Sequence, residues 1–399
     1  MGDLMFLAHR SPFPPDRGDK IRAYHVLKHL AARHRVHLLA FADDPRDLEE
    51  SAGLASLTVS RTILWRGKST GRAAAEALIR GKPVSLTAFD DRAMHRAVAA
   101  TPARWPIDMI YVFSGQMAQY LPARTAARTI MDFCDMDSLK FADYAESARG
   151  PMRWAMMHEA KLLQRFEERV AARVDASLFV SGAEADLFRR RTGAANVRVV
   201  ENGIDTDFFD PDAAFARVEG PDRLIVFTGQ MDYRPNVEAV TWFVDAILPL
   251  VRRRHPDARF AIVGRSPTEA VKALGSREGV IVTGAVADVR GWLAAAACVV
   301  APLRIARGVQ NKVLEAMAMA RPVAASAAAA EGIEHDGTIA GGTTAAEIAD
   351  AVIAVLADPR GAGEMGARAR ARVIARYGWD ARLAPLDALM AGPAGKGAA

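Results

Sequence analysis

CVVAPLRIARGVQNKVLEAMAMARPVAAS, residues 298–326, is the stretch that decides the fold. Its apolar start predicts a strand at Cys298–Leu303, a loop containing Gly308 follows, and a helix is predicted over Asn311–Ala320. The helix ends before Pro322, where a run of small apolar residues begins the next strand. Strand, loop, helix and strand in this order predict a βαβ unit. The free N–H groups and the positive dipole end at the start of such a helix favour a bound phosphate.

Glu315 is the only carboxylate of this predicted helix and lies one turn inside it. A carboxylate at that place is positioned to accept hydrogen bonds from the hydroxyls of a sugar or a ribose. The alternative is an ordinary α/β crossover, in which Glu315 is simply an acid near the positive end of the helix dipole. The pattern alone leaves both interpretations open.

The rest of the chain alternates short apolar runs with amphipathic segments, which predicts parallel, doubly wound α/β sheets. A chain of 399 residues is too long for one compact core, so we expect two domains. Further strands are predicted at Leu4–Ala8, Arg35–Phe41, Thr62–Trp65, Asp108–Val112, Arg128–Asp132, Ala176–Val180, Leu224–Gly229, Ala258–Gly264 and Val280–Gly284, and helices at Ile21–Arg33, Gly71–Arg80, Asp91–Ala100, Met152–Arg173 and Val286–Ala296.

The composition is that of a globular protein, with 51% hydrophobic and 25% charged residues. Cys134 and Cys298 lie far apart in apolar contexts and show no metal-ligand spacing, so we expect buried thiols in a reducing compartment. The first residues contain too short an apolar stretch for a signal peptide. No window approaches the roughly 18 consecutive apolar residues of a membrane-spanning helix. These features predict a cytoplasmic protein.

Positive charge is concentrated in the first half of the chain. Residues 1–190 contain 28 Lys and Arg against 23 Asp and Glu, whereas residues 191–399 contain 24 of each kind. Residues 61–128 hold eleven basic and four acidic residues. This stretch is either an ordinary solvated surface or a patch that holds the first domain to anionic lipid headgroups by charge, without insertion. Nucleic acid is not expected as a partner, because neither a known module nor basic residues interleaved with exposed aromatics are found.

Residues 307–323 resemble the nucleotide-sugar site of the family-4 (group 1) retaining glycosyltransferases. In that family a Glu-x7-Glu motif is followed by Ala-Met-Ala and then by a small residue, Pro and Val. Glu315 matches the second Glu, to which the resemblance assigns the ribose hydroxyls of the donor. Arg307 stands where the first Glu is common, so the role of that first Glu near the transferred sugar does not carry over.

The string RGVQNKVLEAMA is similar to a bacterial subfamily of sugar transferases associated with exosortase/PEP-CTERM exopolysaccharide systems. In this subfamily a basic residue replaces the first Glu, and Asn-Lys precedes the helix. The resemblance implies that Lys312 and Arg307 are the catalytic cations facing a pyrophosphate. It also places Gly308, Gln310 and Asn311 beside the donor.

Two stretches of the second half strengthen the resemblance. The Asn-Gly-Ile-Asp string within VRVVENGIDTDFF, residues 197–209, is typical of the family. In FTGQMDYRPN, residues 227–236, the strand-end Gly229 is expected beside the diphosphate, but Gln and Asn stand where the family has two cations. Arg234 is then a candidate replacement cation, and a solvent-facing side chain is the alternative.

Two stretches of the first half contribute candidate residues. SPFPPDRGDKIRAYH, residues 11–25, matches the subfamily and places Gly18 and Lys20 near the donor phosphates or the acceptor. In MDFCDMD, residues 131–137, three acids follow a strand end, an arrangement that could suggest a metal. The resemblance implies no catalytic metal, so Asp137 is expected to cap a helix and Asp135 to contact hydroxyls of the acceptor or sugar.

The resemblance covers most of residues 4–385 and implies the GT-B fold, in which two Rossmann-like, doubly wound domains face a central cleft. We expect an acceptor-side domain over residues 1–190 and a nucleotide-sugar domain over residues 191–375. A helix over residues 376–390 should cross back to the first domain, and residues 391–399 should form a disordered tail.

The implied function is metal-independent transfer of a hexose, with retention, from a UDP- or GDP-linked sugar to a hydroxyl of a glycan or lipid-linked acceptor. Exopolysaccharide or other surface-glycan synthesis at the inner face of the cell membrane is the expected setting. No cofactor is expected besides the nucleotide-sugar substrate. Two alternatives remain, a nucleotide-sugar 2-epimerase of the same fold and a catalytically silent nucleotide-sugar-binding subunit.

Overall fold

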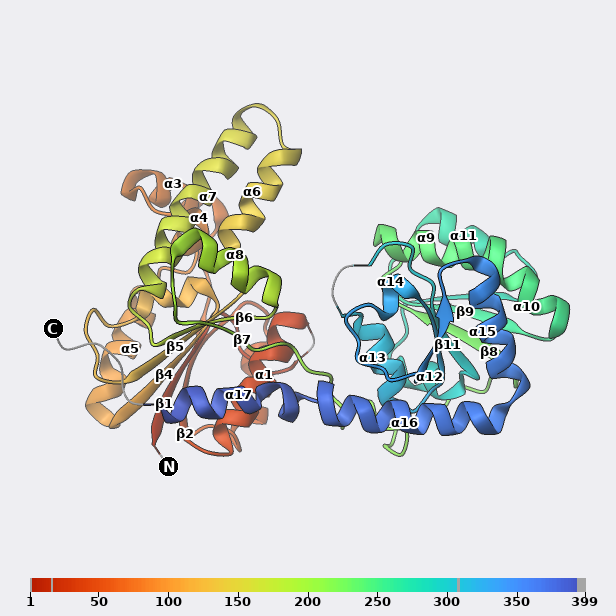
Figure 1. Ribbon diagram of the computed structural model, residues 1–399. Coiled ribbons are helices and arrows are strands. Elements are labelled where there is room, and N and C mark those ends of the chain that lie inside the picture. The colour runs from red at the N-terminus through yellow and green to blue at the C-terminus, as the bar shows by residue number, and fades with distance from the viewer. Residues whose placement is uncertain (1, 16, 307–308, 393–399) are drawn as a thin grey trace. The chain divides into compact units, whose positions relative to one another are not determined.

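The structure is a computed structural model that describes residues 2–15, 17–306 and 309–392 (Figure 1). The chain divides into two compact units. Unit 1 comprises Met1–Asn202 together with Arg382–Ala399, and unit 2 comprises Gly203–Ala381. No helix in the described ranges is both long enough and apolar enough to cross a membrane.

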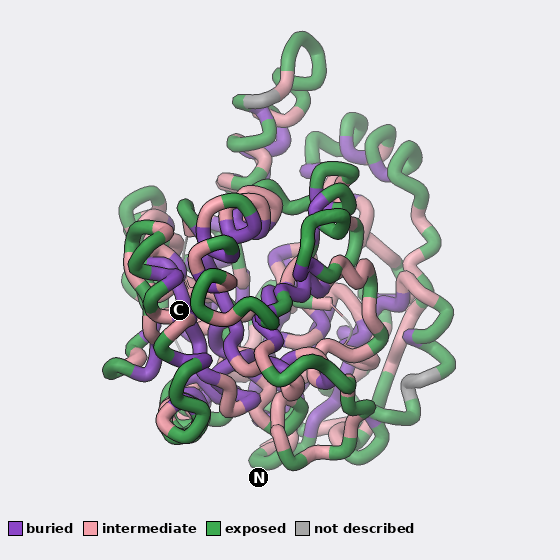
Figure 2. Tube along the Cα trace, turned by 90° about the vertical axis from the view of Figure 1, so that its right-hand side faces the viewer, coloured by how far each residue is buried: buried purple, intermediate pink, exposed green. Residues whose placement is uncertain are grey.

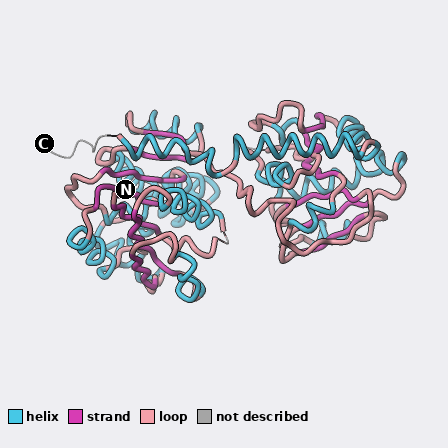
Figure 3. Tube along the Cα trace, turned by 90° about the horizontal axis from the view of Figure 1, so that it is seen from below, coloured by secondary structure: helices cyan, strands magenta, loops and turns pink. Residues whose placement is uncertain are grey.

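Unit 1 is built on a parallel sheet, and strands are magenta in Figure 3. Over the described residues the strand order is β3-β2-β1-β4-β5-β6-β7. The order reverses between β1 and β4, which makes the carboxyl ends of these strands a place where ligands collect in such sheets. The strands are β1 (Asp3–Ala8), β2 (Arg35–Ala42), β3 (Ser60–Trp65), β4 (Ile107–Phe113), β5 (Arg128–Cys134), β6 (Ala176–Phe179) and β7 (Val197–Val199).

The helices of unit 1 cover both faces of its sheet. The α-helices are α1 (Gly18–Ala31), α2 (Arg46–Glu49), α3 (Thr70–Arg80), α4 (Val84–Thr87), α5 (Arg92–Arg104), α6 (Asp137–Ser147), α7 (Gly150–Ala171), α8 (Gly182–Thr192) and α17 (Trp379–Ala391), and the 3-10 helices are η1 (Glu50–Leu54) and η2 (Gly115–Tyr120). One face of β1 packs into a core with α5, the end of α7 and α8. Helix α1 packs beside β2, and α17 is attached to α1 because His29 Nε2 lies 2.9 Å from Asp387 Oδ1.

Unit 2 repeats the same design with strand order β10-β9-β8-β11-β12-β13, and its reversal lies between β8 and β11. Its strands are β8 (Leu224–Thr228), β9 (Arg259–Val263), β10 (Val280–Gly284), β11 (Cys298–Ala301), β12 (Val323–Ser326) and β13 (Ile339–Gly342). Its helices are α9 (Arg234–Trp242), the π-helix η3 (Phe243–Ile247), α10 (Leu248–Arg254), α11 (Glu269–Leu274), α12 (Arg290–Ala295), α13 (Asn311–Ala318), α14 (Ala327–Ala330), α15 (Ala345–Ala357) and α16 (Pro359–Tyr377).

The burial of the strand residues explains why these strands could be predicted from the sequence. Every residue of β1, β6, β8, β11 and β12 is buried, because helices cover both faces of each parallel sheet (Figure 2). The sequence analysis therefore recognised these strands as short continuous apolar runs. The β11–α13–β12 unit has the predicted order, and α13 ends at Ala318, two residues before the predicted Ala320.

The boundary between the units lies after Asn202, later than the predicted boundary after residue 190. The reason is β7, which pairs with β6 and so belongs to the first sheet. The end of the chain, from Arg382, belongs to unit 1. A helix was expected over residues 376–390, and α17 spans Trp379–Ala391. Of the expected tail, residues 393–399 lie outside the described residues.

A buried ion pair links α1 to β5 in unit 1. The Arg22 guanidinium Nε donates to Asp132 Oδ2 at 3.0 Å, and both side chains are almost fully buried. The hydroxyl of Tyr111 donates to the same carboxylate at 2.7 Å. Burial alone would lower the pKa of Arg22, but Asp132 raises it above its ordinary value, so the pair stays charged.

Asp132→Ala should lower the free energy of unfolding of unit 1 by about 3–5 kcal/mol, because it leaves the Arg22 charge buried without compensation. Urea denaturation measures this change. Asp186→Ala is the matched control, since Asp186 pairs with Arg189 on the exposed face of α8 and should matter little. Equal stability of the two variants would contradict the role assigned to the buried pair.

Candidate functional site

A polar pocket of about 610 Å³, the unit 2 pocket, opens at the carboxyl ends of β8, β9 and β10. The start of α13 completes its wall, as expected at the reversal of a doubly wound sheet. Residues from four segments line it: Thr228, Gly229, Gln230, Tyr233, Asn236, Val263, Gly264, Arg265, Ala285, Val286, Val289, Val309, Gln310, Asn311, Lys312 and Glu315.

Two glycines allow the strand ends to approach each other at the base of this pocket. A Cβ atom on Gly264 would lie 1.7 Å from the carbonyl oxygen of Gly229, a distance that no side chain can occupy. A Cβ atom on Gly229 would lie 2.7 Å from the Asn236 amide nitrogen. Glycine is therefore required at Gly264, and at Gly229 it leaves room for the side chains behind it.

Lys312, a predicted cation, lines the unit 2 pocket. Its ammonium group donates to the side-chain oxygen of Asn236 and lies 4.4 Å from the centroid of the Phe227 ring. The amide nitrogen of Asn236 in turn donates to the Gln230 carbonyl at 2.9 Å, which orients the acceptor oxygen toward Lys312. Burial lowers the pKa of Lys312 to about 8, and the nearby Glu315 carboxylate opposes this shift.

Glu315 lies one turn inside α13 and also lines the pocket, as predicted. Burial raises the pKa of Glu315 to about 7, and Lys312 opposes this shift. Within the described parts of the chain no hydrogen-bond donor is seen on the Glu315 carboxylate. It is therefore available to accept hydrogen bonds from a ligand's hydroxyls.

The N-terminus of α13 points its amides into the same pocket. Its N-cap is Gln310, and no side chain within the described residues caps the helix there. Gln310 and Asn311 line the pocket as predicted, whereas Arg307 and Gly308 lie outside the described residues. Backbone N–H groups, the helix dipole and Lys312 together make this wall suited to an anionic group such as a diphosphate.

The structure corrects the prediction for Arg234. Its side chain is 88% exposed, pairs with Glu238 one turn along α9 and does not line the pocket. Arg265, which follows Gly264 after β9, lines it instead and donates to the Gln230 side chain at 3.1 Å. The sequence analysis missed Arg265, although its place directly after a strand-end glycine was the available signal.

A second pocket of about 550 Å³, the unit 1 pocket, opens at the carboxyl ends of β1, β4 and β5. Asp135 and Gly18, both predicted, are among its lining residues. Asp137, which the sequence analysis treated as a helix cap, also lines it. The sequence analysis assigned no ligand-binding role to the other polar members, which are His9, Arg10, Asp19, Arg22, Ser114, Gln116, Lys140 and Asn202. Ser114 (φ 77°) and Cys134 (φ 63°) adopt left-handed backbone conformations at the ends of β4 and β5. Strain of this kind concentrates at functional sites.

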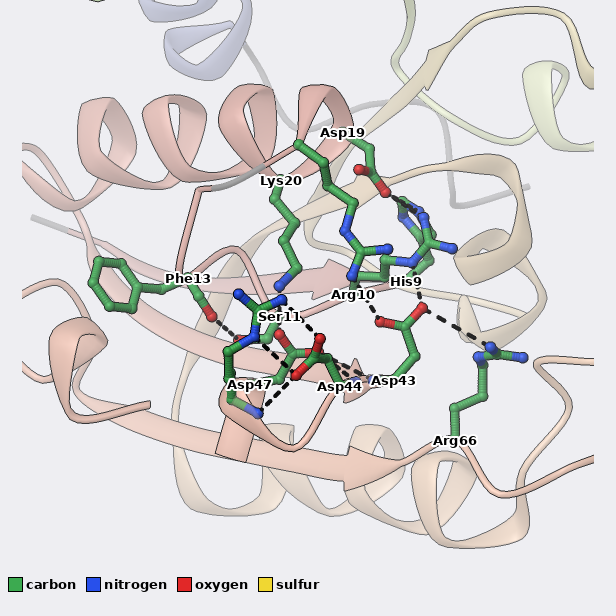
Figure 4. Close-up of polar contacts among 12 residues, drawn as sticks. His9, Arg10, Ser11, Phe13, Asp19, Lys20, Asp43, Asp44, Asp47 and Arg66 are labelled. Atoms are coloured by element: carbon green, nitrogen blue, oxygen red, sulfur yellow. Dashed lines mark hydrogen bonds and ion pairs between the residues drawn. The ribbon is translucent and has the colours of Figure 1, made fainter. Parts of the chain in front are cut away.

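His9 and Arg10 lie beside Asp19 at the wall of the unit 1 pocket (Figure 4). The His9 Nε2 atom lies 3.2 Å from Asp19 Oδ2, and Arg10 pairs with the same oxygen. Burial opposes ionisation of Asp19, but the hydrogen bonds from His9 and Arg10 hold its pKa well below the ordinary range. Asp19 therefore stays charged and keeps both side chains in place.

Lys20 does not line the unit 1 pocket, which corrects its predicted position beside the ligand in that unit. Lys20 is 1% exposed, and its ammonium group forms an ion pair with Asp47 in the segment that follows β2 (Figure 4). The Asp47 carboxylate also accepts from the amides of Asp43 and Asp44 at 3.1 and 3.2 Å. Lys20 thus fixes the loop after β2 and does not contact a ligand in the unit 1 pocket.

The three acids at the end of β5 and just after it do not converge on one point. Asp132 is buried against Arg22, Asp135 is exposed, and Asp137 accepts from the Gln116 amide at 2.9 Å. Met136, rather than Asp137, is the N-cap of α6, which corrects the predicted capping role. No group of three or more metal-ligating side chains is found in the described ranges.

Two parallel, doubly wound units with such pockets define a GT-B protein. The fold is similar to the crystal structure of Anabaena Alr3699/HepE in complex with UDP, with a TM-score of 0.61, 16% sequence identity and coverage of 97% of this chain and 99% of that chain. At that identity the likeness shows the fold alone. The predicted fold class is confirmed.

Sequence comparison identifies the family. Residues 18–208 match the model described as Glycosyltransferase Family 4, and residues 222–358 match the model described as Glycosyl transferases group 1. A GDP-mannose-dependent alpha-(1-6)-phosphatidylinositol monomannoside mannosyltransferase from Mycolicibacterium smegmatis is 30% identical over 263 residues, which cover 60% of this chain and 67% of that protein. The chain belongs to the group 1, family 4 glycosyltransferases.

The corresponding mannosyltransferase from Mycobacterium tuberculosis is 31% identical over 265 residues, which cover 60% of this chain and 66% of that protein. The match thus spans just under two thirds of that relative's length. These relatives are phosphatidylinositol mannosyltransferases, so they do not support the predicted placement in an exosortase-associated subfamily.

Glu315→Ala should weaken the binding of GDP or UDP about tenfold or more, because hydrogen bonds to charged groups contribute about 1.5–3 kcal/mol. Titration calorimetry with both nucleotides measures the change. Glu238→Ala, which removes an exposed carboxylate of α9 outside the pocket, is the control and should bind normally. Parental affinity of the folded Glu315 variant for both nucleotides would contradict the assignment.

Nucleotide affinity should also peak between about pH 7 and pH 8. As pH rises through about 8, Lys312 loses the charge that attracts a diphosphate, so affinity falls. As pH falls through about 7, Glu315 takes a proton and accepts hydrogen bonds less well, so affinity falls again. Calorimetry across pH checks this shape. Lys312→Met should remove the alkaline limb and Glu315→Gln the acidic limb, and unchanged limbs in both variants would contradict it.

Proposed function

We propose that the protein transfers a hexose from a nucleoside-diphosphate sugar to a hydroxyl of a lipid or glycan acceptor, with retention at the anomeric carbon. The observation that carries this proposal is the unit 2 pocket, where Lys312, the α13 N-terminus and Glu315 line one wall. A cation and helix amides suit the diphosphate, and a carboxylate one turn further suits the ribose hydroxyls.

Leaving-group stabilisation supplies most of the proposed rate enhancement. Negative charge develops on the diphosphate as the sugar–oxygen bond breaks. Lys312 is oriented beforehand by its hydrogen bond to Asn236, and the amides at the start of α13 are fixed by the helix itself. Glu315 lies one turn deeper along α13, at the predicted ribose position, so it is not assigned as a nucleophile. This arrangement fits attack on the same face of the sugar, with the departing phosphate oxygen taking the proton of the acceptor hydroxyl.

The acceptor is proposed to bind in the unit 1 pocket. Its lining combines Arg10, Asp135, Gln116 and His9, which offer both donors and acceptors of hydrogen bonds to hydroxyl groups. Arg10 and Lys140 add positive charge that suits an acceptor carrying a phosphate. The pocket lies at the carboxyl ends of the strands, where the sheet order reverses.

The relatives support a particular choice of substrates. The mycobacterial proteins are GDP-mannose-dependent and act on phosphatidylinositol monomannoside, so we propose GDP-mannose as the first donor and a phosphorylated lipid as the first acceptor. A lipid acceptor would bring the protein to the inner face of the cell membrane. The subfamily resemblance of residues 307–318 favours instead a lipid-linked saccharide of exopolysaccharide synthesis, which is the second acceptor to test.

Incubation with GDP-mannose, UDP-glucose and UDP-N-acetylglucosamine, with and without phosphatidylinositol or lipid-linked saccharide, tests the proposal. We expect acceptor-dependent release of one nucleoside diphosphate and a product with the anomeric configuration of the donor, as measured by NMR. Lys312→Met should lower turnover far more than thermal stability, whereas the Glu238→Ala control should do neither.

Other outcomes would favour other functions. Tight binding of a nucleotide sugar without any turnover would indicate a silent binding subunit. Release of an isomerised sugar without an acceptor would indicate an epimerase. Failure to bind any nucleotide at all would overturn the proposed function.

A further inference from the structure

Unit 2 contains a further cavity, here termed the rear pocket, at the opposite end of its sheet from the unit 2 pocket. The segments that lead into β8, β11 and β12 line it, so it opens at the amino ends of these parallel strands. The end of α15 and the first turns of α16, both blue in Figure 1, complete its wall. Its volume is about 1040 Å³, against about 610 Å³ for the unit 2 pocket. Among its lining residues are Glu219, Asp222, Ala297, Arg321, Val355 and Gly363.

Arg321 lines the rear pocket and forms no ion pair with a carboxylate in the part of the chain that the structure describes. Its guanidinium donates to the carbonyls of Met319 and Ala296 at 3.3 and 3.5 Å, and both of these bonds are long. Arg223, which also lines the pocket, pairs instead with Asp257 at 2.6 Å. Because a guanidinium carries five N–H donors, Arg321 has donors left for a ligand.

A second cation, Arg217, adds to the positive charge at this place. Burial is the main cause that lowers the pKa of Arg321, and the charge of Arg217 lowers it further. No carboxylate of the described residues opposes this shift. Arg217 itself donates to the Pro211 carbonyl at 2.8 Å, and its guanidinium carbon lies 4.3 Å from the centroid of the Phe215 ring. A bound anion would relieve the repulsion between these two cations.

The rest of the wall is suited to more than a bare anion. Small apolar side chains, among them Ala297 and Ala320, form part of it together with Val355. In the segment before β8, the exposed residues Glu219 and Asp222 bring two carboxylates to the same cavity. Carboxylates accept hydrogen bonds from hydroxyls and repel a second anionic group. A ligand with one phosphate and several hydroxyls therefore matches both parts of the wall.

We propose that the rear pocket binds a sugar phosphate, with the phosphate on Arg321 and Arg217 and the hydroxyls on Glu219 and Asp222. The planar fork of an arginine donates two parallel N–H···O bonds to a phosphate, which gives such a site its specificity. The inference goes beyond the proposed transfer reaction, because the rear pocket is separate from both pockets assigned to that reaction.

Titration calorimetry of the full chain with glucose 6-phosphate, inorganic phosphate and glucose tests the proposal. Glucose 6-phosphate should bind, inorganic phosphate should bind about tenfold more weakly or less, and glucose should give no measurable heat, because both the anion and the hydroxyls are recognised. Arg321→Gln should weaken the binding of glucose 6-phosphate about tenfold or more, since it removes charge-assisted hydrogen bonds. Arg217→Gln should weaken it about threefold, because this cation is exposed.

Gly363→Trp tests the cavity itself while both arginines are intact. Gly363 lines the rear pocket, and a Cβ atom there would meet no other atom within 4 Å, so a large side chain fits and fills the space of the ligand. This variant should not bind glucose 6-phosphate. The matched control is Arg277→Gln, which removes an arginine paired with Asp245 outside the rear pocket and should bind as the parental chain does. Circular dichroism and Tm show whether each variant is folded.

Lys312→Met separates the rear pocket from the unit 2 pocket, whose wall also suits a phosphate. Glucose 6-phosphate should bind this variant with parental affinity, and loss of binding would assign the phosphate to the unit 2 pocket and overturn the inference. Three other results would also overturn it: no binding of glucose 6-phosphate, parental affinity in folded Arg321→Gln and Gly363→Trp, and inorganic phosphate bound as tightly as glucose 6-phosphate, which would indicate an ion alone.

The nucleotide titrations keep this inference apart from the proposed function. A chain that binds glucose 6-phosphate through Arg321 but binds no nucleotide would contradict the proposed function alone. A chain that binds nucleotide through Glu315 but does not bind glucose 6-phosphate would contradict the rear-pocket assignment alone.

Discussion

The contact between Gly229 and Gly264 is the constraint on which the unit 2 pocket depends. Because neither residue has a Cβ atom, the ends of β8 and β9 converge, and Asn236 fits behind Gly229. The side chain of Asn236 then accepts a hydrogen bond from Lys312. The charge of Lys312 in turn acts on Glu315 and opposes the rise that burial causes in the pKa of that carboxyl group. A chain of short-range contacts thus runs from two glycines to the groups that are suited to a diphosphate and a ribose. A side chain at Gly264 would disturb every later member of this chain.

The sequence was most informative where a single element carries the chemistry. The unit 2 pocket is lined by Lys312, Glu315, Gln310 and Asn311, which the sequence placed together because the β11–α13–β12 order fixes which end of the helix meets the strand ends. Their role in binding a donor stays a prediction. Gly229, which also lines the pocket, was a candidate for a different reason, because it ends the strand predicted over Leu224–Gly229. Arg265 was missed because β9 precedes that element by about forty residues in the chain, and strand order across a sheet is not visible in one sequence.

Long cationic side chains were the least predictable group. Lys20 and Arg234 were both expected beside a ligand on the basis of their neighbours in the sequence. Lys20 instead forms a buried pair with Asp47, which lies beyond β2, and Arg234 turns to Glu238 on its own helix. Similarly, the sequence of residues 61–128 suggests a uniformly basic surface. In the structure, however, Glu76 forms ion pairs with part of the basic residues, and Asp90 pairs with both Arg80 and Lys82. A long flexible side chain reaches several partners, so its position in the sequence does not decide its charge partner.

Ser114 and Cys134 give the unit 1 pocket a property that composition does not reveal. Each holds a left-handed backbone conformation that glycine would adopt without cost, and such strain amounts to about 1–3 kcal/mol per residue. This strain lowers the free energy of unfolding of unit 1, and it is located at the two strand ends that border this pocket. Natural proteins commonly have lower stability at functional sites, because activity and stability make conflicting demands there. Unit 1 therefore holds two strained residues where glycine would relieve the strain, and both lie at the border of this pocket.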